Sequence, residues 1–161
     1  MVVRNKGEML KSIHFFRGLD DAELEEVARL CGEHSYNTGE LCQSEGQATN
    51  RVNIILSGRV GAVIHIPNVS YCSSEIILNT LHAGDIFGWS ALIKGTPWST
   101  LRVLEPTKVL YLDADELIDL CEKNNHLGYI LMKNLSMMIA SSLRRNRMSL
   151  LNALVAIRGG E

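Results

Sequence analysis

Hydrophobic residues change their spacing twice along the chain. In residues 8–33 and again after residue 113, apolar positions recur at intervals of three and four, the period of an amphipathic helix. Residues 34–112 instead form short runs rich in Val, Ile and Leu, separated by glycine-bearing turns. The order predicts an α+β, mainly β domain in which helices flank an antiparallel sheet.

The helical segments carry capping patterns at their N-termini. Asp20 with Glu23 three residues later fits a capping box, and Gly32 is expected to end the helix that follows. Asp113 with Glu116 fits a second N-cap, at the start of a short helix. The expected buried positions of these two helices are Leu24, Val27, Ala28, Cys31, Leu117, Leu120 and Cys121.

The β region divides into candidate strands at its glycines. The runs Arg51–Leu56, Val60–Ile66, Glu75–Leu81 and Lys108–Leu112 are interpreted as strands, and turns at this spacing are typical of a sandwich or barrel. One stretch interrupts the pattern, because Ser90 to Lys94 favours a single helical turn that Gly95-Thr96-Pro97 must end.

A long helix is predicted after Asn124-Asn125, from His126 to Ile157, about 45 Å at 1.5 Å per residue. Its imperfect heptad seam includes a polar residue that can fix register, Asn146, among Ser136, Ile139, Leu143, Leu150, Ala153 and Ile157. We therefore expect a body of residues 1–125 and a C-terminal helix of residues 126–161 that forms a homodimer through residues 126–157. The alternative is a helix packed on its own sheet.

Composition and charge exclude several classes of protein. The 161 residues are 46% hydrophobic and 21% charged, which excludes a disordered or low-complexity chain. The net charge of −2 divides into −6 for residues 1–125 and +4 for residues 126–161. The basic cluster Arg144, Arg145 and Arg147 is interpreted as a solvated helix face, and no direct DNA binding is expected.

The cellular location of the protein is inferred by default, from its first residues and its cysteines. The first residues lack the apolar stretch of a secretory signal, and we expect no membrane association. Four scattered cysteines indicate reduced thiols and a cytoplasmic protein: Cys31, Cys42, Cys72 and Cys121.

Three motifs carry a family resemblance. They are His34-Ser35-Tyr36-Asn37-Thr38-Gly39-Glu40 with Ser44-Glu45-Gly46, then Ile54-Ile55-Leu56-Ser57-Gly58-Arg59-Val60, then Gly84-Asp85-Ile86-Phe87-Gly88 with Ala91-Leu92-Ile93 and Gly95-Thr96-Pro97. Together they resemble the cyclic-nucleotide-binding domain family, and the third resembles its phosphate-binding cassette. The resemblance implies an eight-stranded jelly-roll and a non-catalytic regulatory domain without a cofactor.

The cassette departs from the family at two positions. The resemblance implies a Glu that binds the ribose and an Arg that pairs with the cyclic phosphate, but Trp89 and Trp98 stand there. An indole only donates and carries no charge. Gly88 would let the backbone approach a ligand, with free amides at Ala91 and Leu92. The candidate ligand-binding residues are Phe87, Gly88, Trp89, Ser90, Ala91, Leu92, Trp98, Ser99 and Thr100.

Three interpretations of this cassette stay open. The first is a sensor of a small molecule, nucleotide-like or other, whose binding moves the terminal helices against the barrel. Their face over the pocket, Gly128 to Met138, would report occupancy to a partner protein. The second is a genuine cAMP or cGMP receptor in which Lys94 or Arg102 binds the phosphate. The third is a structural dimerisation module whose pocket the tryptophans close. His82 is a further candidate contact, although a structural role is commoner for such a residue.

No catalytic apparatus emerges from the motifs. Gly88-Trp89-Ser90-Ala91-Leu92 resembles a nucleophile elbow, but Leu92 replaces the required glycine and the strand–turn–helix context is missing. Ile64-His65-Ile66 supplies one histidine where a cupin-type metal site needs two. We therefore expect neither an enzyme nor a metal site.

Overall fold

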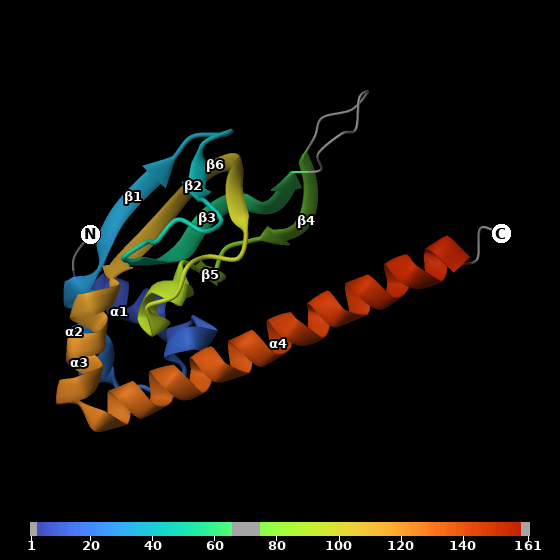
Figure 1. The fold of residues 1–161 in the computed structure, drawn as a ribbon. Helices are drawn as coiled ribbons and strands as arrows, with labels where there is room; N and C mark the ends of the chain where they lie inside the picture. Colours follow the sequence, from blue (N-terminus) through green and yellow to red (C-terminus); the bar gives the residue numbers. More distant parts are fainter. Residues whose placement is uncertain (1–2, 66–74, 159–161) are drawn as a thin grey trace.

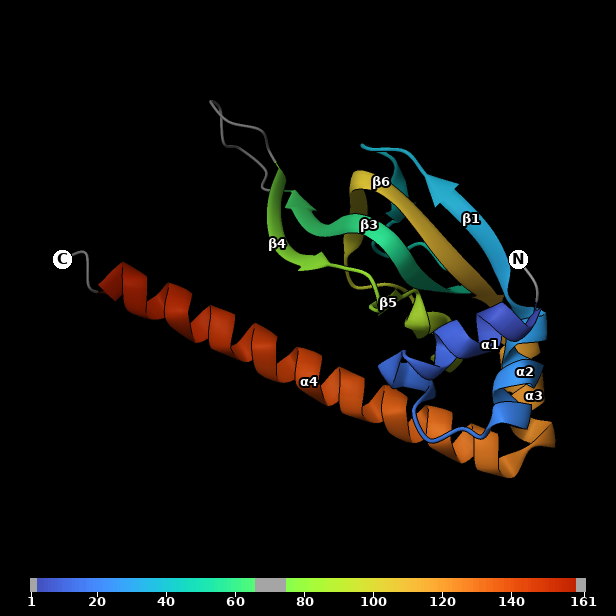
Figure 2. The same cartoon turned by 180° about the vertical axis from the view of Figure 1, so that it is seen from behind.

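A computed structural model describes residues 3–65 and 75–158, in which helices precede and follow the strands of an antiparallel sheet along the chain (Figure 1). The N-terminal segment contains α1 (Val3–Lys11), a 3₁₀ turn η1 (His14–Phe16) and α2 (Asp21–Leu30). The C-terminal segment contains α3 (Ala114–Lys123) and α4 (Asn125–Arg158). In both views α1, α2 and α3 gather at one end of the sheet, from which α4 runs past its lower side (Figures 1 and 2).

The sheet has six strands within the described residues. They are β1 (Gly32–Tyr36), β2 (Leu41–Gln43), β3 (Arg51–His65), β4 (Glu75–Leu81), β5 (Ile86–Phe87) and β6 (Thr100–Asp113). The order is β1-β6-β3-β4, with β2 on β6 and β5 on β3, and every pair is antiparallel. The predicted α+β class with an antiparallel sheet is confirmed.

The predicted count of eight strands is not confirmed, and two predicted boundaries are wrong. Residues 51–56 and 60–65 belong to the single strand β3, because Ser57-Gly58 is an irregularity within the ladder rather than a turn. Gly58 has a φ of 96°, and a Cβ there would lie within 3 Å of the Pro106 carbonyl oxygen. Likewise 108–112 is only part of β6, whereas 75–81 has the predicted bounds. Ile66 lies outside the described residues.

The predicted caps form. Asp20 accepts from the Glu23 backbone N–H and donates its own N–H to the Glu23 side chain, which completes a capping box. Asp113 accepts from the backbone N–H groups of Asp115 and Glu116. Two helix bounds differ from prediction, because α1 begins well before residue 8 and Gly32 opens β1 instead of ending α2.

Two apolar cores hold the elements together. The larger joins α2, α3, η1 and the start of α4 to one side of the sheet, and Ile54, Leu110 and Leu112 belong to it. The smaller fills the space inside the curved sheet and consists of Ile55, Val60, Phe87, Leu101, Val103 and Val109. Neighbouring residues of β3 enter different cores because side chains alternate along a strand.

Helix α4 begins one residue earlier than predicted and has 34 residues. Leu127, Leu131 and Leu135 are buried, and α4 packs chiefly on α3 and η1. Beyond that region it extends past the sheet (Figures 1 and 2), and Leu143 is exposed. The side chains of Asn146 and Leu150 lie outside the described part of the chain. Among the described residues no helix is long and apolar enough to cross a membrane.

Candidate ligand-binding site

The candidate site lies where β5 leads through η2 (Trp89–Ile93) toward β6. Phe87 belongs to the smaller core, which we call the inner core, while Ala91 and Leu92 belong to the larger core, which we call the helical core. The predicted helical turn exists, although it is 3₁₀ and begins one residue earlier, at Trp89. Three of the nine candidate residues are thus packing residues that fix the turn.

Gly88 allows a close backbone approach, but to the protein itself. Its φ is 78°, and a Cβ would lie closer than 3.0 Å to the Arg51 carbonyl oxygen at the start of β3. An L side chain at this position would meet both left-handed strain and a backbone clash. The glycine therefore joins the cassette to β3, a role that the sequence alone did not indicate.

The prediction that the Ala91 amide is free to bind an anion is wrong. The Ala91 N–H donates to the Gly88 carbonyl at 3.0 Å, because a 3₁₀ turn closes on the residue three positions earlier. At the other end of the turn, Gly95 N–H donates to the Ser90 carbonyl at 2.9 Å. The Ala91 N–H, which was expected to bind an anion, therefore makes a hydrogen bond within the turn instead.

The two tryptophans meet edge to face. Their ring centroids are 5.9 Å apart with an interplanar angle of 79°. Trp89 is half-buried against the helical core, whereas Trp98 is 76% exposed. The interpretation in which both indoles fill a closed pocket does not hold for Trp98, which presents its indole to solvent beside Trp89.

The end of the cassette is held by the segment that follows β2. Gln43 Nε2 donates to the Ser99 carbonyl at 3.0 Å, and Gly46 N–H donates to the Pro97 carbonyl at 3.0 Å. Thr100 Oγ1 accepts from the Glu45 N–H at 3.2 Å. These bonds bring Trp98, Ser99 and Thr100 alongside residues 43–46.

The two cations considered for a phosphate bind protein groups. Lys94, exposed and with a φ of 52°, pairs with Asp115 in the first turn of α3. That hydrogen-bonded ammonium lowers the pKa of the Asp115 carboxyl below its ordinary value. Arg102 Nη1 donates to the Gly39 carbonyl at 2.9 Å, and its neighbours Leu101 and Val103 point into the inner core as predicted.

Two buried polar atoms behind the cassette lack a hydrogen-bond partner among the described residues. They are Asn53 Oδ1 and Ser90 Oγ, and their residues are 4% and 6% exposed. Asn53 lies opposite Phe87 in the β3–β5 ladder, yet sequence reasoning did not select it. The sequence feature that could have identified Asn53 is its polar amide within the otherwise apolar run from Val52 to Leu56. A buried hydrogen bond left unmade costs about 1–3 kcal/mol.

The remaining candidates lie outside the cassette. His82 is exposed, and its backbone N–H donates to Asp85 Oδ2 at 2.8 Å, which fits a turn. A cleft of about 360 Å³ lies between α2 and α3, and one of about 130 Å³ between α1 and α2. Neither is lined by a cassette residue. In residues 3–65 and 75–158 no three His, Cys, Asp or Glu side chains gather as metal ligands.

The cysteines of the described part are free thiols. Burial raises the pKa of Cys31 and of Cys42 to about 12, and it also raises the pKa of Cys121. Cys72 lies outside the described residues. Such buried thiols act in packing rather than as nucleophiles.

The antiparallel sheet, the short helical turn between β5 and β6 and the flanking helices define an α+β domain built around one sheet. The sequence profile of the cyclic nucleotide-binding domain matches residues 33–124, more than half of the chain. The chain belongs to the cyclic nucleotide-binding domain family.

Solved structures agree with this assignment. A putative cyclic nucleotide-binding protein from Geobacter metallireducens is 26% identical, with a TM-score of 0.72 over 89% of this chain and 99% of that one. A cyclic nucleotide-binding domain from Methylobacillus flagellatus is 21% identical, with a TM-score of 0.76 over 92% and 82%. The sensor domain of the transcriptional regulator DNR from Pseudomonas aeruginosa is 19% identical, with a TM-score of 0.68 over 88% and 93%. A comparison with curated proteins finds no match.

Proposed function

We propose that the chain is a non-catalytic sensor domain that binds a small ligand beside Trp89 and Trp98 and passes its occupancy to the C-terminal helices. The observation that carries this proposal is the tryptophan pair itself. It occupies the positions at which the family resemblance implies a ribose-binding Glu and a phosphate-binding Arg. A cyclic phosphate would lack a charged partner there, whereas an apolar or flat ligand would gain an aromatic surface.

The route of the signal follows from contacts at the end of the cassette. Lys94 directly follows η2 and pairs with Asp115 in α3, and η2 also packs against α3. A ligand that displaces η2 would shift α3, and α4 follows α3 after a single residue, Asn124. The helices can change position only as far as the ligand prefers one arrangement over the other.

The output of the domain, in this proposal, is a homodimer formed through residues 126–157. Met132, Ile139 and Leu143 lie along one side of α4, where Ile139 packs partly against the larger core while Met132 and Leu143 are exposed, Leu143 by 69%. Exposed apolar residues at this spacing favour a second helix as their partner. Residues 1–125 would then bind the ligand and residues 126–161 would join the two copies, in a cytoplasmic protein that binds no DNA directly.

Intrinsic fluorescence tests the sensor. Both tryptophans of the chain are in the cassette, so a ligand that binds there should change the emission. A panel of nucleotides and metabolites is titrated against the wild type and against Trp98→Phe, which keeps an aromatic ring but removes one emitter. A saturable change that weakens in the variant supports the proposal, and no change across the panel contradicts it.

The second candidate, a receptor for cAMP or cGMP, is favoured by family membership and needs a cation. Calorimetry with both nucleotides on the wild type, Lys94→Ala and Arg102→Ala distinguishes the two. Micromolar binding that either substitution abolishes would establish the receptor and overturn the proposal. We expect no such binding, because both cations already bind protein groups.

A further inference from the structure

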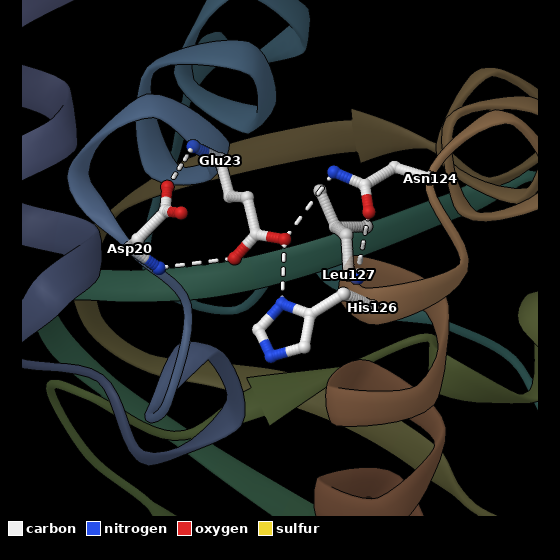
Figure 3. Close-up of polar contacts among 5 residues, drawn as sticks. All are labelled: Asp20, Glu23, Asn124, His126 and Leu127. Atoms are coloured by element: carbon white, nitrogen blue, oxygen red, sulfur yellow. Dashed lines mark hydrogen bonds and ion pairs between the residues drawn. The ribbon is translucent and has the colours of Figure 1, made fainter.

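The carboxylate of Glu23 lies buried in the first turn of α2, where it completes the capping box. The residue is 5% exposed, and its Oε2 accepts from the Asp20 backbone N–H at 3.0 Å (Figure 3). In return Asp20 Oδ1 accepts from the Glu23 N–H at 2.9 Å. A capping box needs one carboxylate oxygen, which leaves the other available.

The other oxygen binds the far end of the chain. Glu23 Oε1 faces His126 Nδ1 at 2.7 Å and accepts from Asn124 Nδ2 at 3.2 Å (Figure 3). Because a carboxylate oxygen accepts, this hydrogen bond forms with the His126 tautomer that has a proton on Nδ1. Residues more than 100 positions apart thus share one carboxylate, which joins α2 to the α3–α4 junction.

Asn124 is the single residue between α3 and α4 and caps both. Its N–H donates to the Leu120 carbonyl at 2.9 Å, which ends α3. Its carbonyl accepts from the Gly128 N–H at 2.9 Å, and its Oδ1 accepts from the Leu127 N–H at 3.1 Å, which begins α4. The only group of Asn124 left over, Nδ2, donates to Glu23, so Glu23 fixes the side chain that fixes the junction.

A second polar contact between α4 and the N-terminal segment lies further along the helix, at Asn134. Asn134, itself buried, donates through Nδ2 to the carbonyls of Phe15 at 2.8 Å and Arg17 at 2.9 Å. The start of α4 is therefore bound at two places to the N-terminal segment. Of these two, only the contact at Glu23 is charge-assisted and reaches the junction itself.

We propose that Glu23 is a positioning residue that sets the angle at which α4 leaves α3 and couples that angle to the N-terminal turn of α2. The same carboxylate serves both ends, so loosening either end weakens the other. This device is separate from the proposed ligand site, because none of its residues lies in the cassette. It would keep α4 in one orientation until Glu23 loses its partners.

Asn124→Asp is the sharpest perturbation. The introduced aspartate still accepts from the Leu127 N–H and remains a good N-cap, but it places a second carboxylate against Glu23 in place of the amide donor. We expect hydrogen exchange to accelerate at least tenfold both at the first turn of α4 and at the first turn of α2. Asp113→Ala, which removes the cap at the other end of α3, is the matched control and should leave the α2 turn unchanged.

The combined substitution Glu23→Gln with Asn124→Asp supplies the rescue. The glutamine introduced at position 23 can accept from the Asp20 N–H through Oε1 while its Nε2 donates to the new carboxylate at position 124, so donor and acceptor exchange places. The second Nε2 proton then faces His126 Nδ1, which accepts it in the neutral tautomer that has its proton on Nε2. We expect the double variant to exchange more slowly in both turns than Asn124→Asp alone. Faster exchange confined to α4, or no recovery in the double variant, overturns the proposal.

The orientation of α4 gives an independent readout. Spin labels at the exposed positions Ser141 in α4 and Lys108 in β6, with Cys72 and Cys121 replaced by serine, report the distance between helix and sheet. A broader or shifted distance distribution in Asn124→Asp and in the milder His126→Ala supports the proposal. An unchanged distribution in both contradicts it. All measurements use protein without ligand, so failure of the ligand proposal does not affect them.

Discussion

Gly88→Ala tests the close approach between the cassette and β3. The native φ of 78° lies in the left-handed region, which costs an L residue about 1–2 kcal/mol. The added Cβ would also lie closer than 3.0 Å to the Arg51 carbonyl oxygen, and overpacking of this kind costs about 1–3 kcal/mol. We therefore expect the free energy of unfolding to fall by about 2–5 kcal/mol.

Gly84→Ala is the matched control for that variant. Gly84 precedes β5 with a φ of 90°, but a Cβ there meets nothing within 4 Å, so only the backbone strain remains. Urea unfolding followed by far-ultraviolet circular dichroism, at one protein concentration, measures both variants without relying on the nearby tryptophans. If Gly88→Ala is no more destabilising than Gly84→Ala, within about 0.5 kcal/mol, the clash with β3 is refuted.

Three further experiments test other parts of the structure. Gly128→Ala should destabilise by about 1–2 kcal/mol although alanine favours helix, because its Cβ would lie 2.8 Å from a carbonyl oxygen of α3. Gly7→Ala, whose added Cβ would meet nothing within 4 Å, should stabilise the fold by up to about 1 kcal/mol. Thermal unfolding measures both variants, and changes in stability of the same sign for Gly128→Ala and Gly7→Ala contradict the α3–α4 contact. Trp89→Ala should cost about 2 kcal/mol and Trp98→Ala under about 0.5 kcal/mol, so equal losses in urea would contradict their different burial. Burial raises the pKa of Cys31 to about 12, so about one Cys31 thiol in 10⁴ is ionised at pH 8. Iodoacetamide labelling, mapped to the residue, should therefore spare Cys31 until the chain unfolds. Labelling of Cys31 in the folded chain at the rate of a free thiol contradicts its burial.

Local chemistry explains which parts of the fold the sequence predicted. The caps at Asp20 and Asp113 depend on residues three positions away, and both form as expected. The strand 75–81 was predicted with its observed bounds, and a turn at Ala83-Gly84 follows it. Ser57-Gly58 was misread because a glycine with positive φ serves a bulge as well as a turn, and only pairing with β6 distinguishes them.

The site was less accessible to prediction because its contacts are not local. The pattern selected Trp89 and Trp98 and brought them together, yet it could not tell that one indole is exposed and the other half-buried. Gly88 was recognised, but its partner Arg51 lies far away in sequence. Glu23 was identified as a capping residue, while its bonds to the α3–α4 junction depend on how distant helices pack.

The length of α4 gives the molecule a mechanical property. Its 34 residues make a rod of about 50 Å at 1.5 Å per residue, and in the described part of the chain its core packing runs from Leu127 to Ile139. A rotation of about 5° at Asn124 would move the far end by about 4 Å, on the order of the diameter of a methyl group. In the proposed function α4 would thus act as a lever arm, which converts a small displacement at its base into a shift large enough to make or break a contact further along the helix.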